Sequence, residues 1–61
     1  MILSGEWLRV IKENALLPLG EVVYCIVDEG FQFRVRTSKE FQGVTEFIFM
    51  ESSKEKFVVL D

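Results

Sequence analysis

The chain has 61 residues, 49% of them hydrophobic, and ten acidic against seven basic side chains give a net charge of −3. A single domain of this size, residues 1–61, buries only about 60% of its unfolded surface and is marginally stable. One cysteine and no histidine exclude an intramolecular disulfide and a Cys/His zinc site. We expect no metal and no cofactor, and oligomerisation is the remaining common stabiliser.

The same composition bears on the compartment. No apolar run reaches the roughly 18 residues that a membrane-spanning helix requires. Residues 1–4 lack the basic region of a signal peptide, and the lone Cys25 suits a reducing environment. We therefore expect a cytoplasmic protein without a membrane partner.

The first element has two interpretations. Four apolar residues share one helical face: Leu3, Trp7, Ile11 and Ala15. Ser4 can cap a helix over residues 4–14, but Gly5 then falls in the first turn, and Trp7, Val10 and Ile11 favour strands. A strand over residues 7–12 is the prediction. An α+β fold, with an N-terminal helix packed on a β-meander, is the alternative.

The rest of the chain alternates turn signals with runs rich in Val, Ile and Phe. The turn signals are Pro18-Leu19-Gly20, Asp28-Glu29-Gly30, residues 37–43 and residues 51–54. Between them we predict strands over residues 21–28, 31–37, 46–50 and 57–60. Gly30 suits the positive φ that the first hairpin turn requires. The polar residues 51–56 are too many for a two-residue turn and favour one helical turn before the last strand.

Alternation within the strands predicts which side chains are buried. In residues 31–37, the side chains of Phe31, Phe33 and Val35 are expected inward and those of Gln32, Arg34 and Arg36 outward. Residues 21–27 and 46–50 are apolar on both faces. If Phe47 and Phe49 point inward, Ile48 and Met50 point outward. The same alternation separates Val22, Tyr24 and Ile26 from Val23, Cys25 and Val27.

This apolar surplus is the feature that bears most on function. Apolar side chains left over after one core is filled face water, a second copy or a partner. The alternative is that a tight barrel bends its strands so strongly that both faces are covered. Cys25, inside an apolar run, is interpreted as a buried structural residue rather than a nucleophile.

No arrangement of residues indicates catalysis. Asp28 and Glu29 lie in a predicted exposed turn, where solvated carboxylates are expected rather than a general acid and base pair. Ser52-Ser53-Lys54 is ordinary turn chemistry. The chain carries no phosphate-binding loop, paired-cysteine motif or calcium loop. We expect a protein that is not an enzyme.

Three segments together resemble the small SH3-like β-barrels of bacterial and phage proteins. They are the strand at residues 7–12 with the loop that closes on residues 17–24, the hairpin of residues 24–33, and residues 47–60. The resemblance implies a five-stranded barrel with a single 3₁₀ turn before the last strand. It does not extend to a proline-peptide groove, because Trp7, Tyr24 and Pro18 are the only residues of their types.

The functional prediction is a non-enzymatic protein-interaction module, of the kind expected in an accessory protein of a bacterium or phage. Its predicted partner is another protein or a second copy of the chain. Its predicted partner-binding residues are Trp7, Tyr24, Arg34, Arg36, Phe41, Ile48 and Met50. The alternative is a nucleic-acid-binding barrel that uses Arg34, Arg36 and Lys39, with Phe41 or Trp7 as a stacking ring. Net negative charge, and the pairing of both arginines with Glu46 or Glu21 across the sheet, argue against that alternative.

Overall fold

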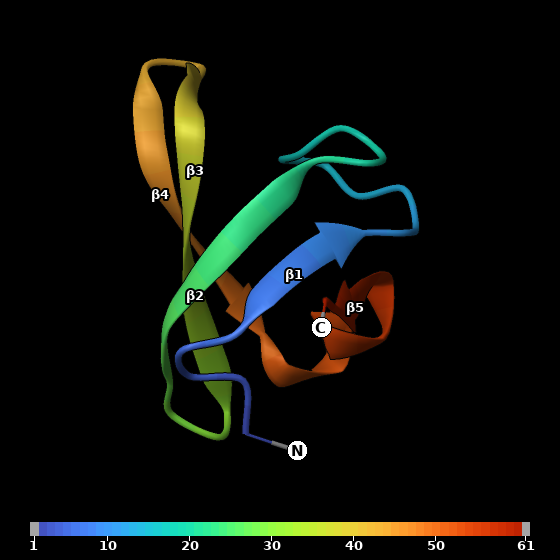
Figure 1. Cartoon of the computed structure of the whole chain (residues 1–61), viewed down its shortest axis with the longest axis vertical. Helices are drawn as coiled ribbons and strands as arrows, with labels where there is room; N and C mark the ends of the chain where they lie inside the picture. The colour runs from blue at the N-terminus through green and yellow to red at the C-terminus, as the bar shows by residue number, and fades with distance from the viewer. Residues whose placement is uncertain (1, 61) are drawn as a thin grey trace.

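The computed structural model describes residues 2–60 and contains one antiparallel sheet (Figure 1). Its elements are β1 (Trp7–Val10), β2 (Val22–Asp28), β3 (Gln32–Phe41), β4 (Val44–Met50), the 3₁₀ helix η1 (Glu51–Lys56) and β5 (Phe57–Val59). The predicted all-β class and the 3₁₀ turn before the last strand are confirmed. The α+β alternative is wrong, because the N-terminal segment enters the sheet as β1. The end residues of the predicted 1–61 domain lie outside the described part.

The strands follow the order β4-β3-β2-β1-β5. β2, β3 and β4 form a meander, and β1 pairs with β2 on one side and with β5 on the other. The tip of the β3–β4 hairpin projects beyond the rest of the molecule (Figure 1). The sheet curves around a single core, which is consistent with a small barrel-like fold.

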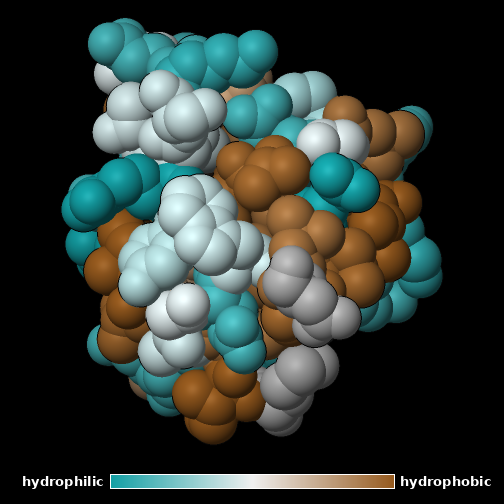
Figure 2. All heavy atoms as spheres, in the orientation of Figure 1, coloured by the Kyte–Doolittle hydropathy of each residue, from teal (hydrophilic) through white to brown (hydrophobic). Residues whose placement is uncertain are grey.

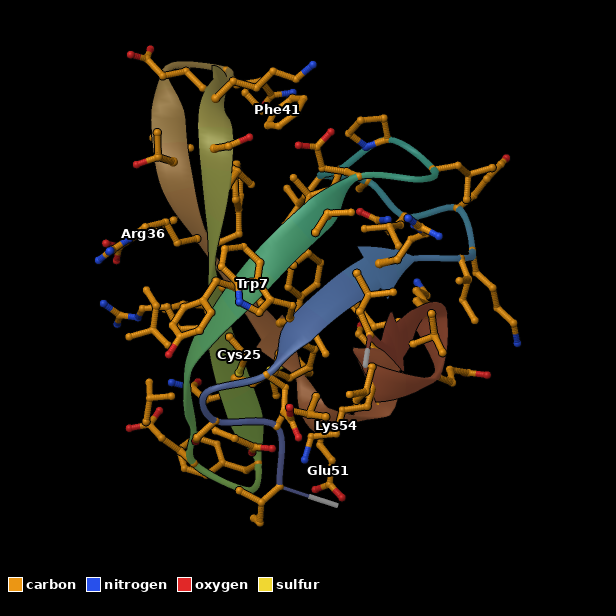
Figure 3. All side chains as sticks on the ribbon, in the orientation of Figure 1. Trp7, Cys25, Arg36, Phe41, Glu51 and Lys54 are labelled. Carbon is orange, nitrogen blue, oxygen red and sulfur yellow. The ribbon has the colours of Figure 1, made fainter. Side chains whose placement is uncertain are left out.

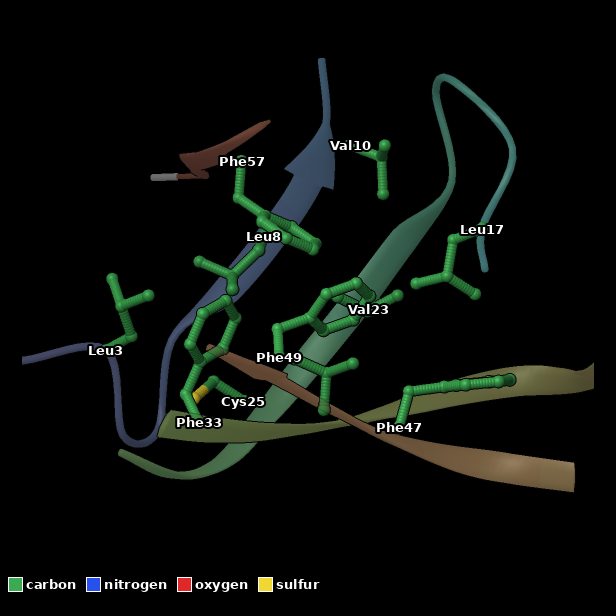
Figure 4. Packing of buried hydrophobic residues seen from close by; sticks show 11 residues of the cluster. Leu3, Leu8, Val10, Leu17, Val23, Cys25, Phe33, Phe47, Phe49 and Phe57 are labelled. Atoms are coloured by element: carbon green, nitrogen blue, oxygen red, sulfur yellow. The ribbon is translucent and has the colours of Figure 1, made fainter. Parts of the chain in front are cut away.

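Every strand contributes to that core (Figure 4). The buried apolar residues are Leu3, Leu8, Val10, Leu17, Val23, Cys25, Phe33, Val35, Phe47, Phe49 and Phe57. The rings of Phe33, Phe49 and Phe57 pack around one another, with centroids 5.1 to 5.6 Å apart. Edge-to-face and offset contacts of this kind stabilise beyond the area they bury. The three rings join β3, β4 and β5 at the centre of the core.

The predicted alternation of buried and exposed side chains is confirmed where the strands pair regularly and is wrong at two places. Phe31 was expected inward, but it is 62% exposed, because it lies in the bend before β3, where no pleat directs its side chain. Val27 was grouped with the buried Val23 and Cys25, but it is 38% exposed. The pairing of β2 with β3 shifts register between Cys25 and Val27. Such a bulge inserts one residue and reverses the alternation that follows.

The predicted turn over residues 37–43 is also wrong. β3 continues to Phe41, and the turn consists of Gln42 and Gly43, which have φ of 54° and 82°. Two positive φ values match the twist of a hairpin and close it in two residues. Residues 38–40 are polar, so apolar alternation did not predict this part of β3. The hydroxyl of buried Thr37 lies 2.6 Å from the carbonyl of Lys39 and 3.2 Å from that of Thr45, so its one proton has an acceptor where the register shifts.

Asp28 joins three segments that are distant in sequence. Its side chain has 0% exposure, and its Oδ2 lies 2.8 Å from the ammonium of Lys54 in η1. The backbone N–H of Leu3 donates to Oδ2 and that of Gly30 to Oδ1, each at 2.9 Å. Its own N–H donates to the hydroxyl of Ser4. These donors hold the pKa of Asp28 down, from 3.8 to about 2, the Lys54 contact being the largest cause.

We therefore expect folding stability to depend on pH through Asp28. Its folded pKa is depressed, so its stabilising contribution is present above about 3.8 and is lost as pH falls toward about 2. Asp28→Asn should lower the urea midpoint at pH 7, and its difference from wild type should vanish below about pH 2. Glu29→Gln, one residue away and exposed, is the control. An unchanged midpoint for Asp28→Asn at pH 7 would contradict the linkage.

Candidate functional site

Six of the seven predicted binding residues lie on the sheet face turned away from the core, here called the outer face. It comprises Trp7, Tyr24, Arg34, Arg36, Glu46, Ile48 and Met50. Trp7 pairs with Tyr24, Tyr24 with Arg36 and Arg36 with Glu46, so one cross-strand row runs over β1, β2, β3 and β4. In the next row Val27 pairs with Arg34 and Arg34 with Ile48. The sheet thus brings residues far apart in sequence into adjacent positions.

Trp7 and Tyr24 form the aromatic end of the outer face. Their ring centroids are 5.1 Å apart in an edge-to-face arrangement. Trp7 remains 55% exposed, and Figure 3 shows it in the middle of the visible face with Arg36 projecting to the left. Contact with Tyr24 restricts the tryptophan, so a partner that covers it loses little side-chain freedom on binding.

Arg34 and Arg36 share the carboxylate of Glu46. Their guanidinium groups lie 3.6 and 3.2 Å from its two oxygens, and all three side chains are 41% to 59% exposed. Arg36 also donates a hydrogen bond to Glu46. The predicted pairing with Glu46 is confirmed. One carboxylate against two guanidinium groups leaves the cluster with a formal charge of +1, and the five N–H donors of each guanidinium exceed what that carboxylate can accept.

The aliphatic end of the outer face lies on β4. Ile48 is 48% and Met50 60% exposed, whereas Phe47 and Phe49 between them are buried. The predicted alternation of β4 is therefore confirmed.

The space-filling view of Figure 2 shows the visible side of the molecule as a mixture of hydrophobic and hydrophilic groups, with pale, weakly polar groups at its centre.

Phe41 is separate from these six residues. It is partly buried and packs against the core at the far end of β3, where the Lys39 ammonium lies 5.7 Å from its ring centroid (Figure 3). Lys39 thus belongs to the projecting hairpin, within the irregular pairing between Arg36 and Phe41. The structure does not bring the proposed Phe41 anchor to the outer face.

Other reactive groups are engaged or buried. Burial, and then the charge of Asp28, raise the pKa of the Cys25 thiol, which disfavours the reactive thiolate. Asp28 itself was expected to be solvated, and this was wrong, because its carboxylate is enclosed by the contacts to Lys54, Leu3 and Gly30. Among residues 2–60, no group of three or more potential metal ligands gathers at one place.

Sequence reasoning missed an apolar cavity of about 290 Å³. It is lined by Leu3, Leu8, Lys54, Phe57, Val58 and Val59. Its walls come from the N-terminal segment, β1, η1 and β5, so no local pattern of residues signals it. Among the described residues that line it, Lys54 carries the charge, and its ammonium contacts Asp28.

Comparison of the chain with protein-family models, curated proteins and solved structures gave no match. Within the described residues, no helix is long and apolar enough to cross a membrane.

The exposed ion pairs on the outer face should contribute little to stability. Glu46→Gln removes the charge that both arginines contact, and because the two exposed contacts share one carboxylate, we take their joint contribution as about 0–1 kcal/mol. We expect the free energy of unfolding to fall by at most about 1 kcal/mol, and the loss to shrink at high salt. Urea denaturation of Glu46→Gln beside Glu13→Gln, an exposed loop control, measures it. A larger loss would make the cluster structural instead of a surface available for binding.

Proposed function

We propose that this protein is a non-enzymatic protein-interaction module that binds its partner through the outer face. The observation that carries the proposal is the row in which exposed Trp7 contacts Tyr24 and Tyr24 pairs with Arg36. Trp, Tyr and Arg are the residue types most enriched among binding hot spots. A row made of all three, on strands rather than on a loop, is held rigidly before a partner arrives.

The exposed apolar residues on β4 extend the proposed interface. Ile48 and Met50 flank the arginine cluster on the side opposite Trp7 and Tyr24, so a partner that spans the face meets apolar groups at both ends. Arg34 and Arg36 then act between them as groups that orient the partner. In this arrangement apolar contacts provide the affinity for the partner, and hydrogen bonds from the guanidinium groups fix its position along the outer face.

The strand order and η1 support the SH3-like resemblance, which we retain as part of this proposal together with a cytoplasmic bacterial or phage origin. The fold restricts the function little, because small barrels serve many unrelated roles. The binding proposal rests on the residues of the outer face and does not depend on the SH3-like resemblance.

Binding should depend on Trp7. Truncation of a hot-spot residue costs about 2 kcal/mol or more, which weakens a complex roughly thirtyfold. Immobilised wild type, Trp7→Ser and Leu19→Ser should be compared for proteins they retain from lysate, with affinities then measured for each retained protein. Leu19 is a matched control, because it is 58% exposed in a loop away from the outer face.

We expect a protein that wild type and Leu19→Ser retain and Trp7→Ser loses. Equal retention by all three variants would show that binding does not use the outer face, and the proposal would be wrong. Far-ultraviolet circular dichroism of each variant establishes that it is folded.

Nucleic-acid binding is the second candidate, favoured by one observation: an exposed tryptophan ring shares a row with Arg36. Against it, Glu46 occupies both arginines, and phosphate affinity depends on basic charge. We expect no binding of single-stranded oligonucleotides to wild type at low salt in fluorescence anisotropy. Binding that falls with salt, and that is lost in the double variant Arg34→Glu/Arg36→Glu, would establish the second candidate instead.

A further inference from the structure

The outer edge of β4 lacks most of the features that usually protect a sheet edge, although its pairing with β3 is irregular between Arg36 and Phe41. β4 stands at one end of the sheet, and among the described residues it pairs with β3 alone. Proteins protect such edges with short strands, lysine, proline or a covering segment, since unpaired N–H and C=O groups accept another strand. β4 has seven residues, contains no lysine or proline, and has Glu46 as its one charge. β5, at the opposite end, has only three residues.

The sequence of β4 is complementary to itself in antiparallel orientation. Phe47 is the midpoint of Val44–Met50, so a two-fold axis at Phe47 pairs all seven residues of each copy. In that register Val44 lies opposite Met50 of the second copy, and Glu46 lies opposite Ile48. Val44, Ile48 and Met50 are each 47% to 60% exposed, and cross-strand apolar pairs stabilise a sheet.

Charge favours the same register. A pairing shifted to place the axis at Glu46 sets two carboxylates opposite each other, which is destabilising. With the axis at Phe47, Glu46 of one copy lies opposite Ile48 of the other, in the row that holds Arg34. Two strand spacings, about 10 Å between Cα atoms, separate that glutamate from Arg34, and the two long side chains span this distance. Arg34 has more N–H donors than Glu46 of its own copy can accept, and in this register a second carboxylate comes within their reach.

We propose that two copies of this chain pair through their β4 edges, with the two-fold axis at Phe47, to form one continuous sheet. The interface is isologous and closes on itself, so it gives a dimer and not a filament. The inference concerns the sheet edge and shares Ile48, Met50 and Arg34 with the proposed interface, whereas it makes no use of Trp7 and Tyr24, so loss of dimerisation in the Ile48 variants and loss of partner binding in Trp7→Ser are separate results.

The test is the molar mass by light scattering on a sizing column, over about a hundredfold range of concentration, since dimerisation follows mass action. Wild type should approach twice its 7.1 kDa as concentration rises. Ile48→Glu places a second carboxylate opposite Glu46 of the other copy, at both symmetry-related positions, and should give the monomer mass throughout. Ile48→Lys places an opposite charge there and should remain a dimer.

Comparison of Ile48→Glu with Ile48→Lys distinguishes strand pairing from non-specific hydrophobic association, because both substitutions remove the same apolar side chain. Val58→Glu, on β5 and 43% exposed, is the control and should stay dimeric. A wild-type monomer at every concentration overturns the proposal. Equal dissociation by Ile48→Glu and Ile48→Lys, or dissociation by Val58→Glu, also overturns it.

Amide hydrogen exchange of the wild type gives a second measurement that does not depend on how the variants fold. Alternate amides of β4 should become protected as concentration rises, while those of β5 should not change. Protection that is independent of concentration in β4 would contradict strand pairing between copies.

Discussion

The carboxylate of Asp28 holds together the parts of this small protein that the sheet does not. It ends β2, and its contacts reach Leu3 before β1, Gly30 in the following turn and Lys54 in η1. In a chain of 61 residues with no disulfide each such contact counts, and the backbone N–H of Gly5, which donates to the carbonyl of Cys25 at 2.9 Å, fixes the same segment. Leu3 is buried beside that carboxylate, so the position of one apolar core residue depends on a charged one.

A carboxylate without exposure is tolerated only if its oxygens have partners. Here the partners are a cation and two backbone N–H groups, which favour the charged form more than burial disfavours it. The outer face shows the opposite balance. The contacts of Glu46 with Arg34 and Arg36 are exposed and screened by water. The same kind of charge pair therefore stabilises the fold at Asp28 and leaves a surface open to partners at Glu46.

The two faces of the sheet also divide the aromatic residues. Phe33, Phe49 and Phe57 fill the core, whereas Trp7 and Tyr24, which carry polar atoms, lie toward water with their rings in contact. Tyr and Trp suit such positions because one end is apolar and the other can hydrogen-bond. Part of the apolar surplus noted in the sequence thus lies on the outer face, as the aromatic pair on β1 and β2 and the aliphatic residues of β4.

Local pattern was sufficient to predict the strands and most of the core. Alternation in β4 separated Phe47 and Phe49 from Ile48 and Met50, and β-favouring residues decided for a strand at Trp7. It failed where the backbone departs from the regular pleat. The bulge after Cys25 turned Val27 outward. β3 extends through a polar run to a turn formed by Gln42 and Gly43, both of which have positive φ. Neither feature has a strong signal in residue type, since Gln-Gly is not the favoured hairpin dipeptide.

The sequence by itself determined the class of fold, because this follows from a period of two along the chain. It also determined the absence of a disulfide and the apolar, aromatic and arginine side chains available for a binding face, because these follow from composition. Only the tertiary structure decided which of them meet. Strand register set Trp7, Tyr24, Arg36 and Glu46 in one row and left Phe41 with the core. It also joined Asp28 to Lys54, 26 positions away, since contacts between distant segments depend on how the strands pair and not on any local pattern.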